Sequence, residues 1–325
     1  MKRTLFILAI LIIVVVLGIP LWVFNEYPRG QGTVLEREPV VRVLDTSTGK
    51  IIKLRLEEYL VGVVAAEMPA DFATEALKAQ AVTARTYTVK RMYSFGGKPS
   101  DRHSNAEICT DPTHCQAWAG YDELKLRWGG LRYYINVEKI KGALKATRGQ
   151  IITYRNNVIE PVYHSSCGGK GTEDSGDVWA GEIPYLRSVE CRSEYKVADH
   201  VYVTKLDNDE IVARIKKLGL SPLSEAGKAG ISIRPISRSL RGRIKEAKVL
   251  GLNISGQQLR QILGLTSTLF TWEISGSTMT FRSVGKGHAV GLCQYGANGL
   301  ALAGNDYRSI VFYYYTGVQL EKLKY

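Results

Sequence analysis

Residues 60–89 read LVGVVAAEMPADFATEALKAQAVTARTYTV, and this stretch decides the expected fold around it. Apolar residues recur at helical spacing on both sides of a break, which predicts helices over 57–68 and 72–93. Pro69 ends the first helix, and Asp71 is placed to cap the second. The sequence therefore predicts a helical hairpin.

Glu67 stands where the helical pattern favours an apolar residue. Leu60, Val63 and Val64 precede it at helical spacing, so Glu67 continues a stripe that faces the interior. Burial and the negative end of the helix dipole both raise the pKa of a carboxyl group, which suits a general acid near neutral pH. The alternative is a solvated glutamate at a frayed helix end. Arg85, on the second predicted helix, is expected to supply a cation near Glu67 or else to be an ordinary exposed arginine.

The N-terminus carries an almost unbroken apolar run over residues 5–24, preceded by Lys2 and Arg3. A helix of about 20 residues rises about 30 Å and spans a bilayer, and the basic residues orient its start toward the cytoplasm. We expect a cytoplasmic start and transmembrane anchor over 1–26, a linker over 27–39 and an extracytoplasmic domain over 40–325. A cleaved signal peptide is the alternative, but no small-residue cleavage site follows the run.

Composition supports a folded chain with a basic surface. The 325 residues are 45% hydrophobic, and the formal net charge is +12. Such a surface suits a polyanion, and outside a membrane a cell wall rich in carboxylates is a better partner than nucleic acid. A generally basic, soluble surface explains the charge equally well.

The remaining segments mix helices and strands without regular alternation. This predicts an α+β fold, with mixed helices and antiparallel strands that form a substrate groove. Hairpins are expected over 40–54 and over 150–164, the second turning at Asn156 and Asn157. Other helices are predicted over 136–148, 208–218, 257–263, 295–303 and 307–315, and other strands over 245–252, 270–274 and 278–284.

Two histidines and two cysteines, His103, Cys109, His114 and Cys115, lie in the loop over 96–117. Together they are a complete tetrahedral set for a structural zinc ion, which leaves no open position for a catalytic water. Their spacing differs from the usual zinc finger. A disulfide between Cys109 and Cys115 is the alternative.

Three motifs, in this order, carry a family resemblance. They read VAAEMP at 64–69 with EALKAQAV at 75–82 and ARTY at 84–87, then YHSSCGG at 163–169, then GHAVGLCQYGA at 287–297. From about Val40 to Gly317 the sequence resembles the stage II sporulation protein D family of endospore-forming bacteria. One departure is Ala289, where the family pattern has glycine, and it affects backbone freedom more than chemistry.

The resemblance implies a lytic transglycosylase. Such an enzyme cleaves between N-acetylmuramic acid and N-acetylglucosamine in peptidoglycan strands, preferably strands without stem peptides, and leaves an anhydro sugar end. Glu67 matches its catalytic acid and base. A hydrolase would need a second carboxylate, and the nearest in sequence, Asp71 and Glu75, are better explained by helix capping and the helix dipole. The side chains expected to bind substrate in the same groove are Arg85, Tyr163, His164, Ser165, Ser166, His288 and Gln294.

The resemblance also implies a zinc ion and protein partners. Family members with a comparable Cys/His loop favour structural zinc over a disulfide there, and Cys167 with Cys191 is then a possible disulfide pair. The implied role is forespore engulfment, in the mother-cell membrane that faces the forespore. The partners would be a peptidoglycan amidase and other membrane proteins of the engulfment machinery. The alternative function is a non-catalytic, wall-binding activator of an N-acetylmuramoyl-L-alanine amidase.

Overall fold

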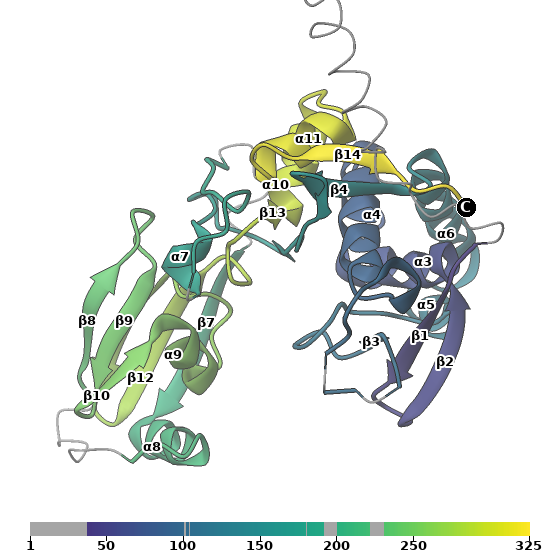
Figure 1. The fold of residues 1–325 in the computed structure, drawn as a ribbon. Helices are drawn as coiled ribbons and strands as arrows, with labels where there is room; N and C mark the ends of the chain where they lie inside the picture. Colours follow the sequence, from purple (N-terminus) through teal and green to yellow (C-terminus); the bar gives the residue numbers. More distant parts are fainter. Residues whose placement is uncertain (1–37, 101, 104, 180, 192–199, 222–230) are drawn as a thin grey trace, which may run out of the picture. The chain divides into compact units, whose positions relative to one another are not determined.

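The helical hairpin predicted from residues 60–89 is present in the computed structural model, which describes residues 38–100, 102–103, 105–179, 181–191, 200–221 and 231–325. Its helices are α3, Leu56–Glu67, and α4, Thr74–Val89 (Figure 1). Leu60, Val63 and Val64 are fully buried, so the predicted inward stripe is confirmed. The apolar stripe therefore brings the end of α3 against the protein core.

The start of α4 is set by a distant residue and not by Asp71. Asp71 is exposed, and the N-cap residue is Ala73, whose side chain makes no capping bond. The amide of Ala73 instead donates to Oδ1 of Asn298 at 2.8 Å, from helix α10, Gln294–Leu302. The predicted Asp71 cap is wrong because a tertiary contact satisfies the backbone where a local cap was expected.

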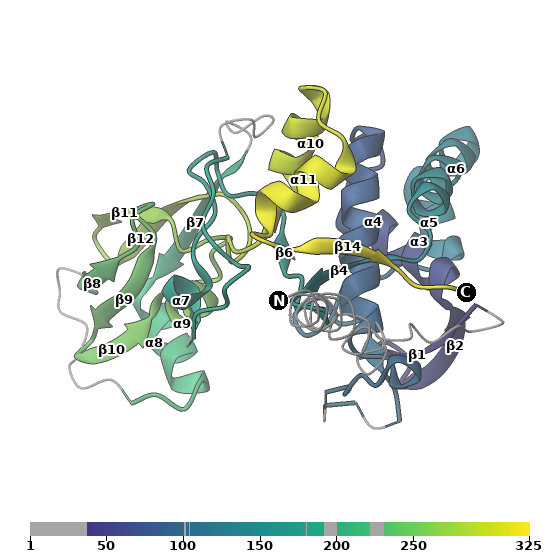
Figure 2. The same ribbon diagram turned by 45° about the horizontal axis from the view of Figure 1, so that its top comes forward.

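Helix α4 is surrounded by other elements (Figure 2). It packs against α3, α10, α6 (Gly130–Ala146), α11 (Tyr307–Tyr314) and strand β4 (Gln150–Tyr154). Every residue of α4 from Ala76 to Val89 except Lys78 is accordingly buried. The sequence missed helix α5 and placed the start of α6 too late. Shorter helices are α5 (Tyr121–Trp128), α7 (Ser175–Val178) and the 3₁₀ turn η2 (Tyr93–Phe95).

Two sheets join distant parts of the chain through parallel strands. β1, Val40–Asp45, pairs antiparallel with β2, Lys50–Arg55, as predicted, but it also pairs parallel with β3, Ile108–Cys109. β6, Tyr163–His164, pairs parallel with β13, Leu292–Cys293. The expectation of antiparallel strands is wrong for these two pairs, because each joins segments separated by a long connection, as parallel pairing requires.

The second predicted hairpin is shorter than expected. β4 turns back into β5, Asn157–Val158, through Arg155 and Asn156, whose φ angles are 51° and 63°. Two successive positive φ angles are typical of a tight I′ hairpin turn, one position earlier than predicted. Beyond β5 the chain leaves the hairpin, and β6 pairs with β13 instead. The other edge of β4 pairs antiparallel with β14, Gln319–Lys322.

A second group of strands and helices has a hydrophobic core of its own. Buried residues from two three-stranded antiparallel sheets and two helices meet there, with Leu259, Phe270 and Phe281 among them. The strands β7 and β8 were not predicted because most of their side chains are exposed or half-buried. The elements are β7 (Val201–Asp207), α8 (Asn208–Lys217), β8 (Ile233–Arg238), β9 (Ile244–Val249), β10 (Leu252–Ser255), α9 (Gly256–Leu263), β11 (Phe270–Ser275) and β12 (Thr278–Val284).

The predicted anchor over 1–26 and nearly all of the predicted linker over 27–39 lie outside the described residues. Within the part of the chain that is described, no helix combines the length and apolar character needed to span a bilayer. The mixed α+β architecture itself is confirmed.

Candidate functional site

Glu67 is the last residue of α3 and lies at the wall of an open pocket of about 310 Å³. Met68 leaves the helix with extended backbone angles, as expected of a residue before proline. Among the residues that line this pocket, Glu67 alone has a carboxyl group. The lining residues are Ala65, Ala66, Glu67, Met68, Pro69, Ala70, Arg127, Trp128, Ser165 and Tyr295.

The carboxyl group of Glu67 is held by a backbone amide and a phenol. Oε1 accepts a hydrogen bond from the Ala117 amide at 2.7 Å, and the Tyr163 hydroxyl lies 3.1 Å from the same oxygen. Burial raises the pKa of Glu67, while the Ala117 amide, the Tyr163 hydroxyl and the Gln294 side chain act to lower it. Burial is the larger effect, so the predicted upward shift of this pKa is confirmed in direction.

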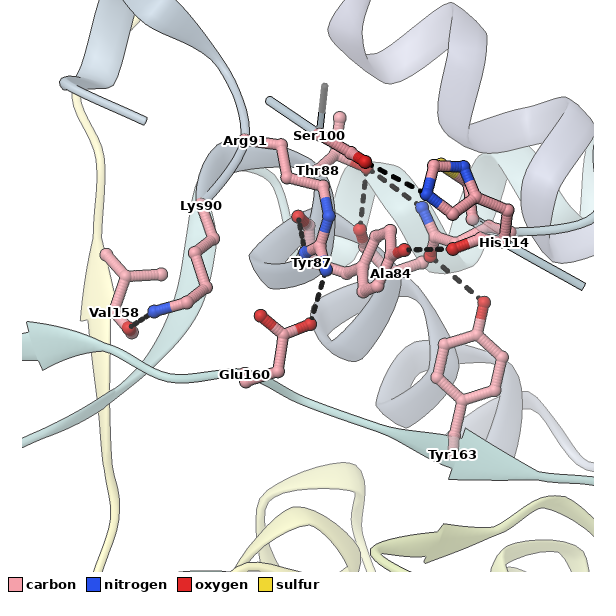
Figure 3. Close-up of polar contacts among 12 residues, drawn as sticks. Ala84, Tyr87, Thr88, Lys90, Arg91, Ser100, His114, Val158, Glu160 and Tyr163 are labelled. Carbon is pink, nitrogen blue, oxygen red and sulfur yellow. Dashed lines mark hydrogen bonds and ion pairs between the residues drawn. The ribbon is translucent and has the colours of Figure 1, made fainter. Parts of the chain in front are cut away.

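The hydroxyl of Tyr163 also belongs to a hydrogen-bond chain that runs into α4 (Figure 3). It lies 3.0 Å from Oε1 of Gln116, whose Nε2 donates to Thr88 Oγ1 at 3.1 Å. The Thr88 hydroxyl donates in turn to the Ala84 carbonyl oxygen at 2.8 Å. Because that carbonyl can only accept, Thr88 Oγ1 accepts from the Gln116 amide nitrogen, and the amide oxygen of Gln116 faces Tyr163.

The Tyr163 hydroxyl also affects the protonation state of Glu67. It has one proton and two acceptors within reach, Glu67 Oε1 and Gln116 Oε1. Donation to Glu67 stabilises the carboxylate, so Tyr163 lowers the pKa that burial raises. Gln116 competes with Glu67 for the same phenol proton.

His288 positions the strand that carries Tyr163. Its Nδ1 accepts from the Val290 amide at 3.1 Å, so its proton lies on Nε2, which donates to the Tyr163 carbonyl oxygen at 2.9 Å. Burial lowers the pKa of His288 to about 4, so the ring is neutral. Ala289 has a φ of 66°, the left-handed conformation that the glycine of the family pattern adopts without strain. Through its bond to the carbonyl oxygen, His288 thus fixes the backbone of Tyr163.

The residues that follow Tyr163 divide between the pocket and the interior. Ser165 lines the pocket, and its carbonyl oxygen accepts from the Tyr295 amide at 3.1 Å. His164 is buried with Nδ1 3.2 Å from the Val290 carbonyl oxygen, and burial lowers its pKa to about 4. Ser166 is buried and bonds His200 at 2.8 Å. His164 and Ser166, predicted to bind substrate, therefore make interior contacts in this structure.

Gln294 is the first residue of α10, and its buried side chain lies close enough to Glu67 to influence the pKa of that carboxyl group. The structure thus brings the third sequence motif to the predicted acid. Tyr295, the next residue, lines the pocket.

Arg85 is not near the pocket wall and is fully buried. Its guanidinium forms a bidentate ion pair with Glu57, with N···O distances of 2.8 and 2.7 Å. It also donates to the carbonyl oxygens of Ala81 and Gln150. The prediction that Arg85 binds substrate is contradicted by this burial, because all these donors are directed to protein groups. The helical pattern of the sequence could not reveal that Glu57 is its partner.

The four predicted metal ligands converge. The ligand atoms of His103, Cys109, His114 and Cys115 all lie within 4.8 Å of one another. Nδ1 of His114 is 3.4 Å from Cys109 Sγ and 3.6 Å from Cys115 Sγ, and Nε2 of His103 is 3.6 Å from Cys115 Sγ. Tetrahedral zinc with sulfur at about 2.3 Å and nitrogen at about 2.0–2.1 Å places such atoms about 3.6 Å apart.

The other nitrogen of each ring is held by an oxygen atom, as in known metal sites. Nδ1 of His103 is 3.2 Å from the Ala106 carbonyl oxygen, and Nε2 of His114 is 3.1 Å from Ser100 Oγ (Figure 3). Such contacts orient ligand imidazoles. The residues present therefore fit a zinc ion better than the alternative disulfide.

Several residues around Glu67 were not predicted from the sequence. Gln116 and Ala117 directly follow Cys115 and reach Tyr163 and Glu67. Trp128 ends a helix that the sequence did not indicate, and with Arg127 it lines the pocket. Tyr295 could have been predicted, because it directly follows Gln294 in the third motif.

The comparisons with known proteins identify the family of the chain. A Stage II sporulation protein family model matches residues 45–154. Stage II sporulation protein D of Bacillus subtilis (strain 168) is 36% identical over 300 residues, 91% of this chain and 83% of that protein. The same protein of Bacillus amyloliquefaciens is 34% identical over 295 residues, 90% and 82% of the two chains. The Amidase enhancer of Bacillus subtilis (strain 168) is 28% identical over 308 residues, 80% of this chain and 40% of that protein. With relatives 34% and 36% identical over 90% and 91% of its length, the chain belongs to the stage II sporulation protein D family.

Proposed function

We propose that this sporulation protein is a lytic transglycosylase that cleaves peptidoglycan between N-acetylmuramic acid and N-acetylglucosamine. The observation that carries the proposal is a single, partly buried carboxyl group in an open pocket. Glu67 first protonates the glycosidic oxygen of the leaving sugar. The resulting carboxylate then takes the proton from the muramoyl 6-hydroxyl, whose oxygen closes on the anomeric carbon and leaves an anhydro end.

A hydrolase would need a second carboxylate at about 5–9.5 Å from the first. Glu75, one of the two candidates in sequence, bonds Lys78 at 2.6 Å and accepts from the Tyr307 amide at 2.9 Å. Asp71, the other candidate, is exposed, and neither residue lines the pocket of Glu67. This favours transglycosylation over hydrolysis.

The pocket has the side chains that a glycan needs. Trp128 and Tyr295 offer aromatic surface for the apolar faces of sugar rings. Arg127 pairs with Glu123 at 2.7 Å and is exposed, so its remaining donors can reach carboxylate or carbonyl groups of the wall. We propose that Ser165 and Gln294 complete the substrate contacts, and that Tyr163 and His288 position the acid.

We propose a structural zinc ion for the Cys/His loop, coordinated by His103, Cys109, His114 and Cys115. With four protein ligands the ion has no position for a catalytic water, so it acts by fixing the loop. The loop continues directly into Gln116 and Ala117. Zinc would thus hold the Ala117 amide against Glu67 without taking part in the reaction.

In the cell we propose that the chain is anchored through residues 1–26 in the mother-cell membrane and faces the forespore. There it would cleave glycan strands during engulfment, on strands that a peptidoglycan amidase has cleared of stem peptides. The amidase and other membrane proteins of the engulfment machinery are the proposed partners, and nucleic acid is not.

A second candidate is a non-catalytic activator of an N-acetylmuramoyl-L-alanine amidase. It is favoured by the similarity to the Amidase enhancer of Bacillus subtilis. A pocket that binds glycan without cleaving it would satisfy this function.

The test compares the full-length chain with Glu67→Gln on glycan strands stripped of stem peptides, with fragments analysed by mass spectrometry. Glu58→Gln, an exposed glutamate on the same helix, is the matched control. Anhydro-ended fragments from wild type and Glu58→Gln, but not from Glu67→Gln, support the proposal. Fragment ends that carry an added water indicate a hydrolase. If the folded wild-type protein cleaves no glycan, the proposal is wrong and the amidase-activator function is favoured.

A further inference from the structure

Three cysteines from separate segments meet away from the Cys/His loop. The sulfur atoms of Cys167, Cys191 and Cys293 all lie within 4.8 Å of one another, and all three residues are buried. Cys167 follows β6, and Cys293 ends β13 immediately before α10. We call them the cysteine trio. The structure contains no disulfide among its cysteines, so the suggested Cys167–Cys191 pair is not formed.

Two backbone amides are directed at one sulfur of the trio. The amides of Cys167 and Gly296 both donate to Cys293 Sγ at 3.4 Å, and this sulfur caps the first turn of α10. Burial raises the pKa of the Cys293 thiol, and the amide donors and the helix N-terminus oppose this effect by stabilising the thiolate. The Tyr314 hydroxyl is 3.2 Å from Cys191 Sγ.

Gly296 shows how closely the chain packs around the trio. A methyl group at this position would collide with Cys191 Sγ and with the Tyr314 hydroxyl. The absence of a side chain at Gly296 is therefore what allows Cys191 and the Tyr314 ring to approach α10.

We propose that the cysteine trio binds one thiophilic closed-shell cation, Zn²⁺ or Cu⁺, as a second metal site of the chain. A disulfide would use two of the three sulfurs, whereas a metal ion uses all three. Three thiolates match the trigonal coordination of Cu⁺, and the Tyr314 hydroxyl is the nearest oxygen to complete a tetrahedral set for Zn²⁺. Binding converts thiols to thiolates and releases their protons to solvent.

The position of the site gives the ion a structural role. It would join the chain after β6 to the start of α10, the two segments that carry Ser165 and Gln294 toward Glu67. Such a clamp is independent of the reaction proposed for Glu67 and of the zinc ion in the loop. Loss of either would leave the trio's metal in place.

The test measures metal stoichiometry in full-length protein, stripped with a chelator under reducing conditions and then loaded with Zn²⁺ or with Cu⁺. The double variant Cys109→Ser/Cys115→Ser removes the loop site, and Cys191→Ser/Cys293→Ser removes the trio. We expect two equivalents of at least one ion on wild type and one equivalent on each double variant. The ion that remains on the loop variant identifies the preferred metal.

One result would overturn the proposal: a folded loop variant that binds neither ion. If a variant does not fold, Co²⁺ loaded on wild type replaces it as the probe. Thiolate-to-cobalt absorption that saturates at two equivalents supports the trio, and saturation at one contradicts it. The thermal midpoint of the folded loop variant should also rise with added metal, as for any ligand that binds only the native state.

Discussion

At Glu67, burial and hydrogen bonding act on the same carboxyl group in opposite directions. Burial raises its pKa, while the Ala117 amide stabilises the carboxylate form. In the proposed reaction, the general acid step needs the proton, and the base step that follows needs the carboxylate. An acid whose neutral form is favoured but whose anion keeps one strong donor suits both steps.

Cleavage should fall as pH rises through the raised pKa of Glu67, because only the protonated form can start the reaction. The fall in cleavage rate should be centred above the ordinary glutamate pKa, since the pKa of Glu67 is shifted upward. Initial rates of anhydro-end formation across pH, in buffers of constant ionic strength, measure it. A fall in rate centred at or below the ordinary glutamate pKa would contradict the role given to burial.

Glu67→Gln should stabilise the fold at neutral pH. The pKa of Glu67 is higher in the folded than in the unfolded chain, so stability is lost as pH rises between the two values. A neutral amide escapes this loss, and one pKa unit corresponds to about 1.4 kcal/mol. Denaturant unfolding should give the variant a larger free energy of unfolding than wild type at high pH, and the same value below the unfolded glutamate pKa. If the two proteins differ in free energy of unfolding by the same amount at both pH values, ionisation of Glu67 is not the cause.

Tyr163→Phe tests the hydrogen-bond chain. Removing the hydroxyl separates Glu67 from Gln116, and we expect activity to fall about tenfold, the equivalent of one hydrogen bond of about 1.4 kcal/mol. Tyr134→Phe, an exposed tyrosine on α6, is the control. Glycan cleavage rates with thermal unfolding of both variants measure the effect. Unchanged activity in folded Tyr163→Phe would remove Tyr163 from the site.

Among the elements, the Cys/His loop has the most direct influence on the acid. Cys115, Gln116 and Ala117 are consecutive, so a ligand of the proposed zinc ion is two residues from the amide that bonds Glu67. Local spacing predicted the four proposed ligands, because four metal-binding side chains in one loop are unusual. It could not reveal the path of the chain after Cys115, which depends on contacts with α3 and α4.

Removing the proposed zinc should therefore lower activity as well as stability. Cys115→Ser is expected to lower the thermal midpoint and to reduce cleavage at least tenfold even below that midpoint, because the Ala117 amide loses its fixed position. Thr113→Ala, an exposed change in the same loop, is the control. A folded Cys115→Ser protein with wild-type activity would show that loop and acid are not coupled.

The α3–α4 pair is held by the buried ion pair of Arg85 and Glu57. Arg85→Ala should destabilise the protein by about 3–5 kcal/mol, because it leaves a largely buried carboxylate without its partner. Combining it with Glu57→Leu should recover part of the loss. Denaturant unfolding measures both. A rise in KM on glycan without a change in stability would instead restore Arg85 as a substrate ligand.

Over the whole molecule, the sequence predicted what depends on local periodicity and missed what depends on distant contacts. The α3–α4 hairpin and α10 follow from helical spacing, and Glu67 was found because it interrupts an apolar stripe. β7 and β8 lack clear alternation in the sequence because apolar residues, Val201, Val203 and Ile236, stand at exposed positions of these strands. The motifs located Tyr163 and Gln294, but only the folded chain separates residues that face the pocket from those, such as His164, that are buried.

The short parallel pair of β6 and β13 has a consequence for the order of assembly. Tyr163 and His288 are 125 positions apart in the sequence, and their bond forms only when both segments have been synthesised. Non-local contacts of this kind are slow to form, and chains emerge N-terminus first. A nascent chain that already contains Glu67 therefore lacks the support of Tyr163 and Gln294 until its last part arrives. A chain built this way would carry out the proposed cleavage only after it is complete.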